Sequence, residues 1–294
     1  MRLSFLIILL AISSSIFGQK QELIQSIHQV IEGKAATVGV AVIYDNSDTL
    51  VIHNEHKYPL MSVFKFPQAL ALLDYMDKNS IDLDAQVFID KSDLRENTYS
   101  PMRDKYPNGD FLISLKELIE YSVSQSDNNA SDWLFDKMLG PYVTTMYLRN
   151  LGLYDFEIVD TERELEISFD KQYANWISPL EAARLLDVYK STNLLSPKYK
   201  DFLDRALIET STGLDKIKGL LPSEVVVAHK TGMSSRNDLG LKAADNDIAI
   251  VFLPNGKSFS IAVLITNSTE DNKTNAQIIA EISKLVYDYY VDQK

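Results

Sequence analysis

Cysteine is absent from the 294-residue chain, and only four histidines are present. The lack of thiols excludes disulfides, thiolate metal sites, a cysteine nucleophile and a lipidated N-terminal cysteine. The histidines are not spaced as a metal-binding pair, so we expect no metal site. An exported form of this protein must therefore be stabilised by its core alone.

Basic residues are also few, because 29 lysines and arginines stand against 41 aspartates and glutamates, giving a net charge of −12 at pH 7. An acidic surface repels phosphate backbones and anionic lipids. We therefore expect neither nucleic acid nor an anionic membrane as a partner. The charge places no limit on a small-molecule substrate.

The apolar stretch within residues 1–18, MRLSFLIILLAISSSIFG, is too short to span a bilayer comfortably. Arg2 precedes it, and small residues lead to Gly18. This pattern predicts a secretory signal peptide that is cleaved after Gly18, with an uncleaved membrane anchor as the alternative. Cleavage predicts secretion to the periplasm and no membrane attachment of the mature chain.

The hydrophobic pattern predicts an α+β fold, because strands occur at both ends of the chain and helices in the middle. A hydrophobic content of 46% is enough for a large core. We expect a five-stranded antiparallel sheet, with hairpin turns at DNSD and PNGK, flanked by N- and C-terminal helices. The predicted parts are a helix at 19–32, a discontinuous α/β lobe at 19–61 and 212–294, an all-helical lobe at 62–211 and a last helix at 275–291.

Ser62 stands three residues before Lys65 in the apolar stretch PLMSVFKFPQ. On a helix, residues three apart lie on one face, so the lysine amine can take the proton of the serine hydroxyl and leave a nucleophile. The alternative is that Lys65 lies along the helix surface and Ser62 caps the helix. The same pattern occurs again at Ser168 and Lys171, so the motif alone does not decide.

Two further motifs lie where the predicted lobes meet. Ser126, Asp127 and Asn128 precede a helical stretch, where they either cap it or supply a proton relay and an amide for a substrate carbonyl. Lys230, Thr231 and Gly232 end a hydrophobic strand. They are either an ordinary strand end or a site in which a ligand approaches the glycine and its carboxylate meets the lysine and threonine. We expect the adjacent His229 to pack in the core.

A third segment, VDTERELEISFDKQYANW, carries Glu162 and Glu166. On a helical turn these carboxylates would repel one another unless one has a catalytic role or both face solvent. Surface acids without a role are the alternative.

In this order and spacing, the four motifs resemble those of the class A serine β-lactamases. The stretches YSPMRDKYP, SVSQSDNNASDWL and GLLPSEVVVAHKTG are also similar to this family, so the resemblance covers the whole mature chain. The chain is most similar to the subgroup with a short insertion between the Ser-x-x-Lys and Ser-Asp-Asn motifs. The resemblance implies the β-lactamase/transpeptidase fold and hydrolysis of penicillins or cephalosporins through an acyl-enzyme. It also implies a β-lactam as substrate and no metal or organic cofactor.

The resemblance also implies a role for each motif residue. Ser62 would be the nucleophile, Lys65 would help take its proton, Ser126 would protonate the departing lactam nitrogen, and Glu162 would activate the deacylating water. For this family it is disputed whether the residue at the position of Lys65 or that at the position of Glu162 is the base for acylation. The substrate-binding residues implied in the same way are Asn128 for the side-chain amide, Lys230 and Thr231 for the carboxylate, Gly232, Met233 with Ser62 for the oxyanion hole, and Tyr99 at the cleft entrance.

Several positions depart from the family pattern. Glu166 replaces a common asparagine that helps to hold the water, and this second carboxylate should perturb deacylation. Asp160 replaces the arginine that pairs with the closing aspartate, which is Asn175 here, so the loop must be held otherwise. The usual carboxylate-binding arginine is not evident; Lys216 or Arg236 would substitute. Pro67 lies beyond the first turn of the expected helix, where it should bend the helix.

Two alternatives to a β-lactamase remain. A penicillin-binding D-Ala-D-Ala peptidase shares three of the motifs but lacks the deacylating glutamate. A β-lactam-sensing domain would acylate and signal, and would need a partner or a membrane segment. No feature of the sequence demands an oligomer, so we expect a monomer.

Overall fold

The computed structural model describes residues 18–45 and 48–292. The predicted leader lies outside these residues, except for Gly18. The first helix is described over residues 18–31. The later helices are α2 (Lys65–Lys78), α3 (Pro101–Lys105), α4 (Leu115–Ser124), α5 (Asn128–Lys137), α6 (Pro141–Asn150), α7 (Glu162–Leu165), α8 (Pro179–Ser191), α9 (Pro197–Ile208) and α10 (Asn272–Val291), with the 3₁₀ helices η1 (Met61–Phe64), η2 (Lys91–Asp93) and η3 (Asp170–Tyr173). The strands are β1 (Thr37–Tyr44), β2 (Asp48–Ile52), β3 (Tyr58–Pro59), β4 (Gln86–Ile89), β5 (Phe111–Ser114), β6 (Phe156–Glu157), β7 (Trp176–Ile177), β8 (Val227–Met233), β9 (Lys242–Phe252) and β10 (Ser258–Ser268).

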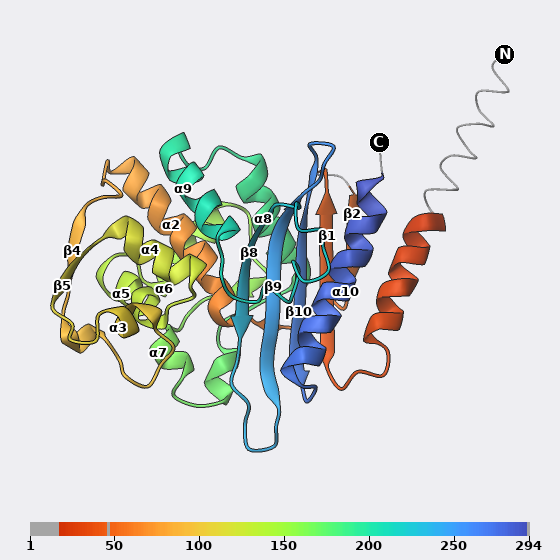
Figure 1. Cartoon of the computed structure of the whole chain (residues 1–294), viewed down its shortest axis with the longest axis horizontal. Helices are drawn as coiled ribbons and strands as arrows, with labels where there is room; N and C mark the ends of the chain where they lie inside the picture. The colour runs from red at the N-terminus through yellow and green to blue at the C-terminus, as the bar shows by residue number, and fades with distance from the viewer. Residues whose placement is uncertain (1–17, 46–47, 293–294) are drawn as a thin grey trace, which may run out of the picture.

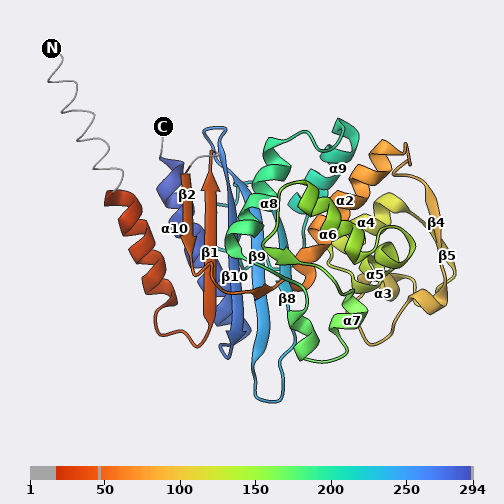
Figure 2. The same ribbon diagram turned by 180° about the vertical axis from the view of Figure 1, so that it is seen from behind.

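The main sheet has the strand order β2-β1-β10-β9-β8, and every neighbouring pair is antiparallel. The first helix and α10 cover one face, and α8 and the other helices lie on the opposite side (Figures 1 and 2). Side chains on β1 alternate between these faces, since Val40 and Val42 pack with α10 whereas Ala41 and Ile43 pack with the helical side. The predicted α+β fold with a five-stranded antiparallel sheet is confirmed.

The middle of the chain differs from the all-helical lobe that the sequence predicts. Residues 62–211 are mostly helical, but they also contain the pair β4–β5 and the strands β6 and β7, which join β3 in a small sheet. Strands of two to four residues are too short to show an alternating pattern. The predicted lobe boundaries remain a prediction.

The last helix begins at Asn272, three residues before the predicted start. Asp271 caps it by accepting a hydrogen bond from the Thr274 N–H. Every helix within the described residues is too short or too polar to span a lipid bilayer.

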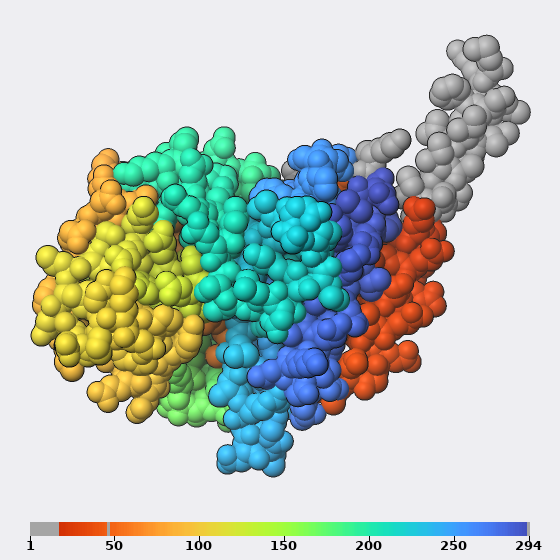
Figure 3. Space-filling view, viewed as in Figure 1, coloured from red at the N-terminus to blue at the C-terminus, as the bar shows by residue number. Residues whose placement is uncertain are grey.

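The edge strand β8 carries Lys230 and Thr231 and faces the helical region. In Figure 3 the yellow segments of this region border the cyan segments, and the blue segments of the sheet side lie beyond them. The 3₁₀ helix η1 packs against β8 and β9, which brings Ser62 to the same place as the Lys-Thr-Gly motif.

Candidate active site

A cavity of about 630 Å³ contains most of the residues that the sequence singles out. The predicted residues that line it are Ser62, Tyr99, Ser126, Asn128, Glu162, Thr231 and Met233. Lys65 and Lys230 are fully buried behind this surface. The structure therefore brings together residues from η1, α5, α7 and β8 that lie far apart in the sequence.

Ser62 and Lys65 meet at the junction of two helices. Ser62 lies in η1 and Lys65 begins α2, so the predicted single helix is in fact a 3₁₀ turn followed by an α-helix. In a 3₁₀ turn, residues three apart are nearly eclipsed, and the Lys65 Nζ lies 3.0 Å from the Ser62 Oγ. Met61 precedes the serine with a φ of 44°, a strained conformation of the kind found at functional sites.

Pro67 does not occupy the position in the helix that the sequence suggests. Because α2 begins at Lys65, the proline lies in the first turn. N–H groups in a first turn have no partner within the helix, so the missing donor costs no hydrogen bond there.

Glu162 completes a triangle with the serine and the lysine. Ser62 Oγ donates to Glu162 Oε1 at 2.9 Å, and the Lys65 Nζ lies 2.9 Å from the same oxygen. Glu162 opens the short helix α7, which Thr161 and Glu164 cap reciprocally. The glutamate is 3% exposed, so the pair is shielded from bulk water.

Lys65 also binds the segment that carries Ser126. Its Nζ donates to the Ser126 carbonyl at 2.8 Å and to Asn128 Oδ1 at 2.6 Å. Ser126 has a φ of 59°, which is unusual for a residue with a side chain. Its hydroxyl accepts a hydrogen bond from the Lys230 Nζ at 2.9 Å.

Burial lowers the pKa of Lys230 well below the usual range, and the positive charge of Lys65 lowers it further. The lysine is 0% exposed, which is why desolvation dominates.

Asp127 has a structural task in the Ser-Asp-Asn motif. It caps α5 by accepting from the Ala130 N–H at 2.8 Å, and it also accepts from the Met102 N–H at 2.7 Å and the Ser100 hydroxyl. These bonds fasten the segment of Tyr99 to α5. The helix-cap reading of the motif therefore applies to Asp127, whereas Ser126 and Asn128 face the cavity.

The sequence predicts that Gly232 leaves room for a ligand. In the structure, the space beside Gly232 is taken by the protein's own backbone. A Cβ there would lie 2.3 Å from the Leu60 carbonyl oxygen and 3.0 Å from the Val63 nitrogen. The backbone of the turn that carries Ser62 thus occupies this space. Asn246 of β9 fastens the same turn, because its Nδ2 donates to the Pro59 carbonyl at 2.7 Å.

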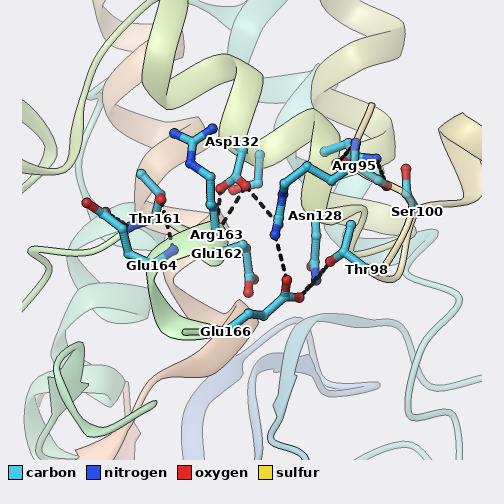
Figure 4. Close-up of polar contacts among 12 residues, drawn as sticks. Arg95, Thr98, Ser100, Asn128, Asp132, Thr161, Glu162, Arg163, Glu164 and Glu166 are labelled. Atoms are coloured by element: carbon cyan, nitrogen blue, oxygen red, sulfur yellow. Dashed lines mark hydrogen bonds and ion pairs between the residues drawn. The ribbon is translucent and has the colours of Figure 1, made fainter. Parts of the chain in front are cut away.

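The predicted repulsion between Glu162 and Glu166 is relieved, because each carboxylate has its own cation. Glu166 pairs with Arg95 at 2.7 Å and accepts hydrogen bonds from Thr98 Oγ1 at 2.6 Å and Asn128 Nδ2 at 3.1 Å (Figure 4). Arg95 also pairs with Asp132 at 2.9 Å. Residues 158–175, here called the glutamate loop, are thereby pinned to the helical region.

Asn175 and Lys171 replace the salt bridge that the glutamate loop lacks. Asn175 Oδ1 accepts from the Val159 and Asp160 N–H groups at 2.8 and 2.9 Å, and its Nδ2 donates to the Asp160 carbonyl at 2.7 Å. Lys171 Nζ donates to Asp160 Oδ2 at 3.0 Å. The second Ser-x-x-Lys pattern therefore serves the loop and not a nucleophile.

Asn175→Ala is expected to lower the free energy of unfolding by about 2–3 kcal/mol, because the buried N–H of Asp160 and the partly buried N–H of Val159 lose their acceptor. Urea unfolding measures this, and the control is Asn79→Ala at an exposed helix end, for which we expect less than about 0.5 kcal/mol. Equal losses in both variants would contradict the role of Asn175.

Asp132 titrates in an unusual range. Burial, and then the Glu162 carboxylate, raise the pKa of Asp132 from 3.8 to about 6, although Arg95 opposes this. Its carboxylate also accepts the Arg163 backbone N–H at 3.1 Å. Asp132 of α5 is thus linked to the start of α7 in two ways, by the charge of Glu162 and by the hydrogen bond from Arg163.

Between pH 3.8 and about 6, the folded chain binds more protons at Asp132 than the unfolded chain does. Stability at this site therefore falls as the pH rises through that window. From about pH 4 to about pH 7, we expect the unfolding free energy of the wild type to fall by about 2 kcal/mol relative to Asp132→Asn. Urea unfolding of both proteins across this range checks the prediction, and parallel pH profiles would contradict it.

Lys216 and Arg236, the two candidates for the missing arginine, have different environments. Lys216 lines the cavity and pairs with Asp245 at 2.6 Å. Arg236 donates to the Gly240 carbonyl at 2.7 Å and to Asn272 at 3.2 Å, and it is not among the lining residues. Of the two, Lys216 is placed to meet a ligand.

Several residues at the site belong to no motif that the sequence shows. Thr212 lines the cavity and its hydroxyl lies 2.6 Å from that of Thr231, while Arg95 and Asp132 hold the glutamate loop. Asp132 stands four residues after Asn128 on α5, a spacing that places both on one face. Arg95 carries no comparable signal.

His229 is buried as predicted, with its Nδ1 3.1 Å from Asp247 Oδ1.

Within the described residues, no group of three or more His, Cys, Asp or Glu side chains is arranged to bind a metal ion. What the site offers is a hydroxyl between an amine and a carboxylate, with a second hydroxyl bound to a second lysine. This arrangement fits nucleophilic attack by Ser62 with proton transfer to neighbouring side chains.

Comparison with known proteins identifies the family. A family model described as "Beta-lactamase enzyme family" matches residues 22–290. A β-lactamase of Bacteroides uniformis is 46% identical over 271 residues, which cover 92% of each chain. The extended-spectrum β-lactamase PER-1 of Pseudomonas aeruginosa is 36% identical and covers 96% of this chain and 92% of its own.

A solved structure shows the same fold. The class A β-lactamase from Bacteroides cellulosilyticus is 45% identical and has a TM-score of 0.90, with 94% of this chain and 99% of that chain covered. The protein therefore belongs to the β-lactamase enzyme family and is of the class A type.

Proposed function

We propose that the protein hydrolyses the β-lactam ring of penicillins and cephalosporins through an acyl-enzyme on Ser62. The observation that carries this proposal is the position of Ser62 Oγ, which lies 3.0 Å from the Lys65 amine and 2.9 Å from the Glu162 carboxylate. Both groups are within reach of the hydroxyl proton, so either can accept it as the oxygen attacks the carbonyl carbon.

Ring opening needs a proton on the lactam nitrogen. Ser126 donates its hydroxyl proton to the nitrogen from the cavity side. Lys230 Nζ donates a hydrogen bond to the Ser126 Oγ at 2.9 Å and stabilises the negative charge that the transfer leaves on this oxygen. The negative carbonyl oxygen is stabilised by the backbone N–H groups of Ser62 and Met233. The ring carboxylate is bound by Thr231 and Lys230, with Lys216 on the same side of the cavity.

Water then hydrolyses the ester on Ser62, with Glu162 as the general base. Because Glu166 is held by Arg95 and Thr98, it is not free to compete with Glu162 for this water. This favours Glu162 over Glu166 as the base. A base for deacylation supports a β-lactamase over a penicillin-binding peptidase, which stays acylated.

Export is the second part of the proposal. Residues 1–18 direct the chain to the periplasm, and the mature protein is a monomer that begins at Gln19. The mass of the protein recovered from a periplasmic extract tests the cleavage site, and gel filtration tests the monomer.

The experiment that tests the function mixes purified residues 19–294 with a chromogenic cephalosporin. Absorbance follows turnover while intact-mass spectrometry follows covalent adducts. We expect rapid turnover without a lasting adduct. A persistent acyl mass without turnover would instead identify a penicillin-binding or sensing protein.

A further inference from the structure

Glu166 is a charged group of the cavity to which the proposed mechanism gives no task. Its side chain lines the cavity and is 35% exposed. Its cation partner, Arg95, is not among the lining residues. A ligand in the cavity therefore meets the carboxylate, whereas the guanidinium lies behind it.

The charges around the cavity are unevenly distributed. Among the described residues that line it, the acids are Glu162, Glu166, Asp215 and Asp245, and the one basic residue is Lys216. Lys216 contacts Asp245 and the Asn246 carbonyl of β9, so it lies on the sheet side with Lys230 and Thr231. Glu166 contacts Thr98 and Asn128, so it lies on the helical side.

Asn128 places the substrate relative to Glu166. Its Nδ2 donates to Thr98 Oγ1 at 2.9 Å and to Glu166 Oε1 at 3.1 Å. The resemblance to class A β-lactamases implies that the substrate's side-chain amide carbonyl binds this same nitrogen, where it replaces one of the two acceptors. The α-carbon of the acyl group is then two bonds from the contact atom. A substituent on that carbon then lies beside the Glu166 carboxylate.

We infer that Glu166 is a specificity-determining residue that selects β-lactams by the charge on the α-carbon of their acyl side chain. An α-ammonium group is attracted to the carboxylate, and an α-carboxylate group is repelled by it. The preferred substrates are thus zwitterions, with the ring carboxylate toward Lys230 and the ammonium group toward Glu166. The inference rests on the proposed function.

Glu166 also anchors the glutamate loop through Arg95, so a substitution affects more than charge. Loss of the anchor alone would slow all substrates by a similar factor, because it would misplace Glu162. Loss of the charge changes the ratio between substrates of opposite charge. The ratio therefore separates selection from anchoring.

The test measures kcat/KM for three penicillins that share the ring and the phenyl group and carry a phenylacetyl, an α-aminophenylacetyl or an α-carboxyphenylacetyl side chain. The assays are run near pH 6.5, at which an α-amino group, with a pKa of about 7.7, is protonated. The variants are the wild type, Glu166→Gln and, as a control, Asp170→Asn. Asp170 is an exposed acid on the same loop and outside the cavity lining.

We expect Glu166→Gln to lower the ratio of the α-amino to the α-carboxy substrate by about tenfold, a shift that salt reduces. Asp170→Asn should change the ratio by less than about twofold, because its charge is exposed and screened. An unchanged ratio in Glu166→Gln would overturn the inference and leave the proposed function intact. If the wild type hydrolyses none of the three penicillins, the proposed function fails and the inference fails with it.

Discussion

Replacing Glu162 by glutamine is expected to turn the protein into one that is acylated but does not turn over. The amide keeps the size of the side chain and its contact with Ser62 Oγ, but it cannot accept a proton from water. Lys65 still lies 3.0 Å from the serine and can serve acylation. Deacylation has no such substitute, so we expect the steady-state rate to fall about a thousandfold.

Intact-mass spectrometry after mixing with a penicillin is the measurement. Glu162→Gln should carry the mass of the opened drug for as long as it is observed, whereas Ser62→Ala should carry none. The matched control is Glu166→Gln, which removes the neighbouring carboxylate on the same loop and should turn over without accumulating the adduct. Accumulation in Glu166→Gln together with undiminished turnover in Glu162→Gln would instead identify Glu166 as the base.

The sequence predicts the reacting groups because each belongs to a short motif. Ser62 and Lys65 are three residues apart, and Ser126 and Asn128 are two apart, so local geometry fixes how each pair lies. The long β9 and β10 strands and their PNGK turn are likewise local features, and the structure confirms the hairpin. Features with a local cause are thus accessible from the residues alone.

Features that depend on distant packing are not accessible in this way. Arg95 pairs with Glu166 across 71 positions of the chain, and no motif surrounds it. The sequence predicts repulsion between Glu162 and Glu166 because it shows their spacing but not the cations that separate them. Similarly, Lys216 and Arg236 are equal candidates in the sequence, and only the packing of β9 and α10 decides which one reaches the cavity.

Gly232 is a further case, and Gly232→Ala is expected to impair both stability and catalysis. The new Cβ would approach the Leu60 carbonyl to 2.3 Å, so the backbone of β8 or of the serine turn must move. Overpacking of this kind costs about 1–3 kcal/mol of unfolding free energy. The serine turn carries Ser62 and β8 carries Lys230, so either movement changes their relative position, and a displacement of about 1 Å lowers kcat/KM about a hundredfold.

Urea unfolding and steady-state kinetics measure the two effects. Gly140→Ala is the matched control, because a Cβ at Gly140 has its nearest neighbour at 3.8 Å and the backbone φ of −71° suits alanine. We expect Gly140→Ala to leave kcat/KM unchanged. If Gly232→Ala keeps full activity, the fixed contact between β8 and the serine turn does not position the nucleophile. If kcat/KM falls about a hundredfold while the protein stays folded, the glycine of the Lys-Thr-Gly motif holds Ser62 in place. The contact that it makes is with the enzyme's own turn and not with a ligand.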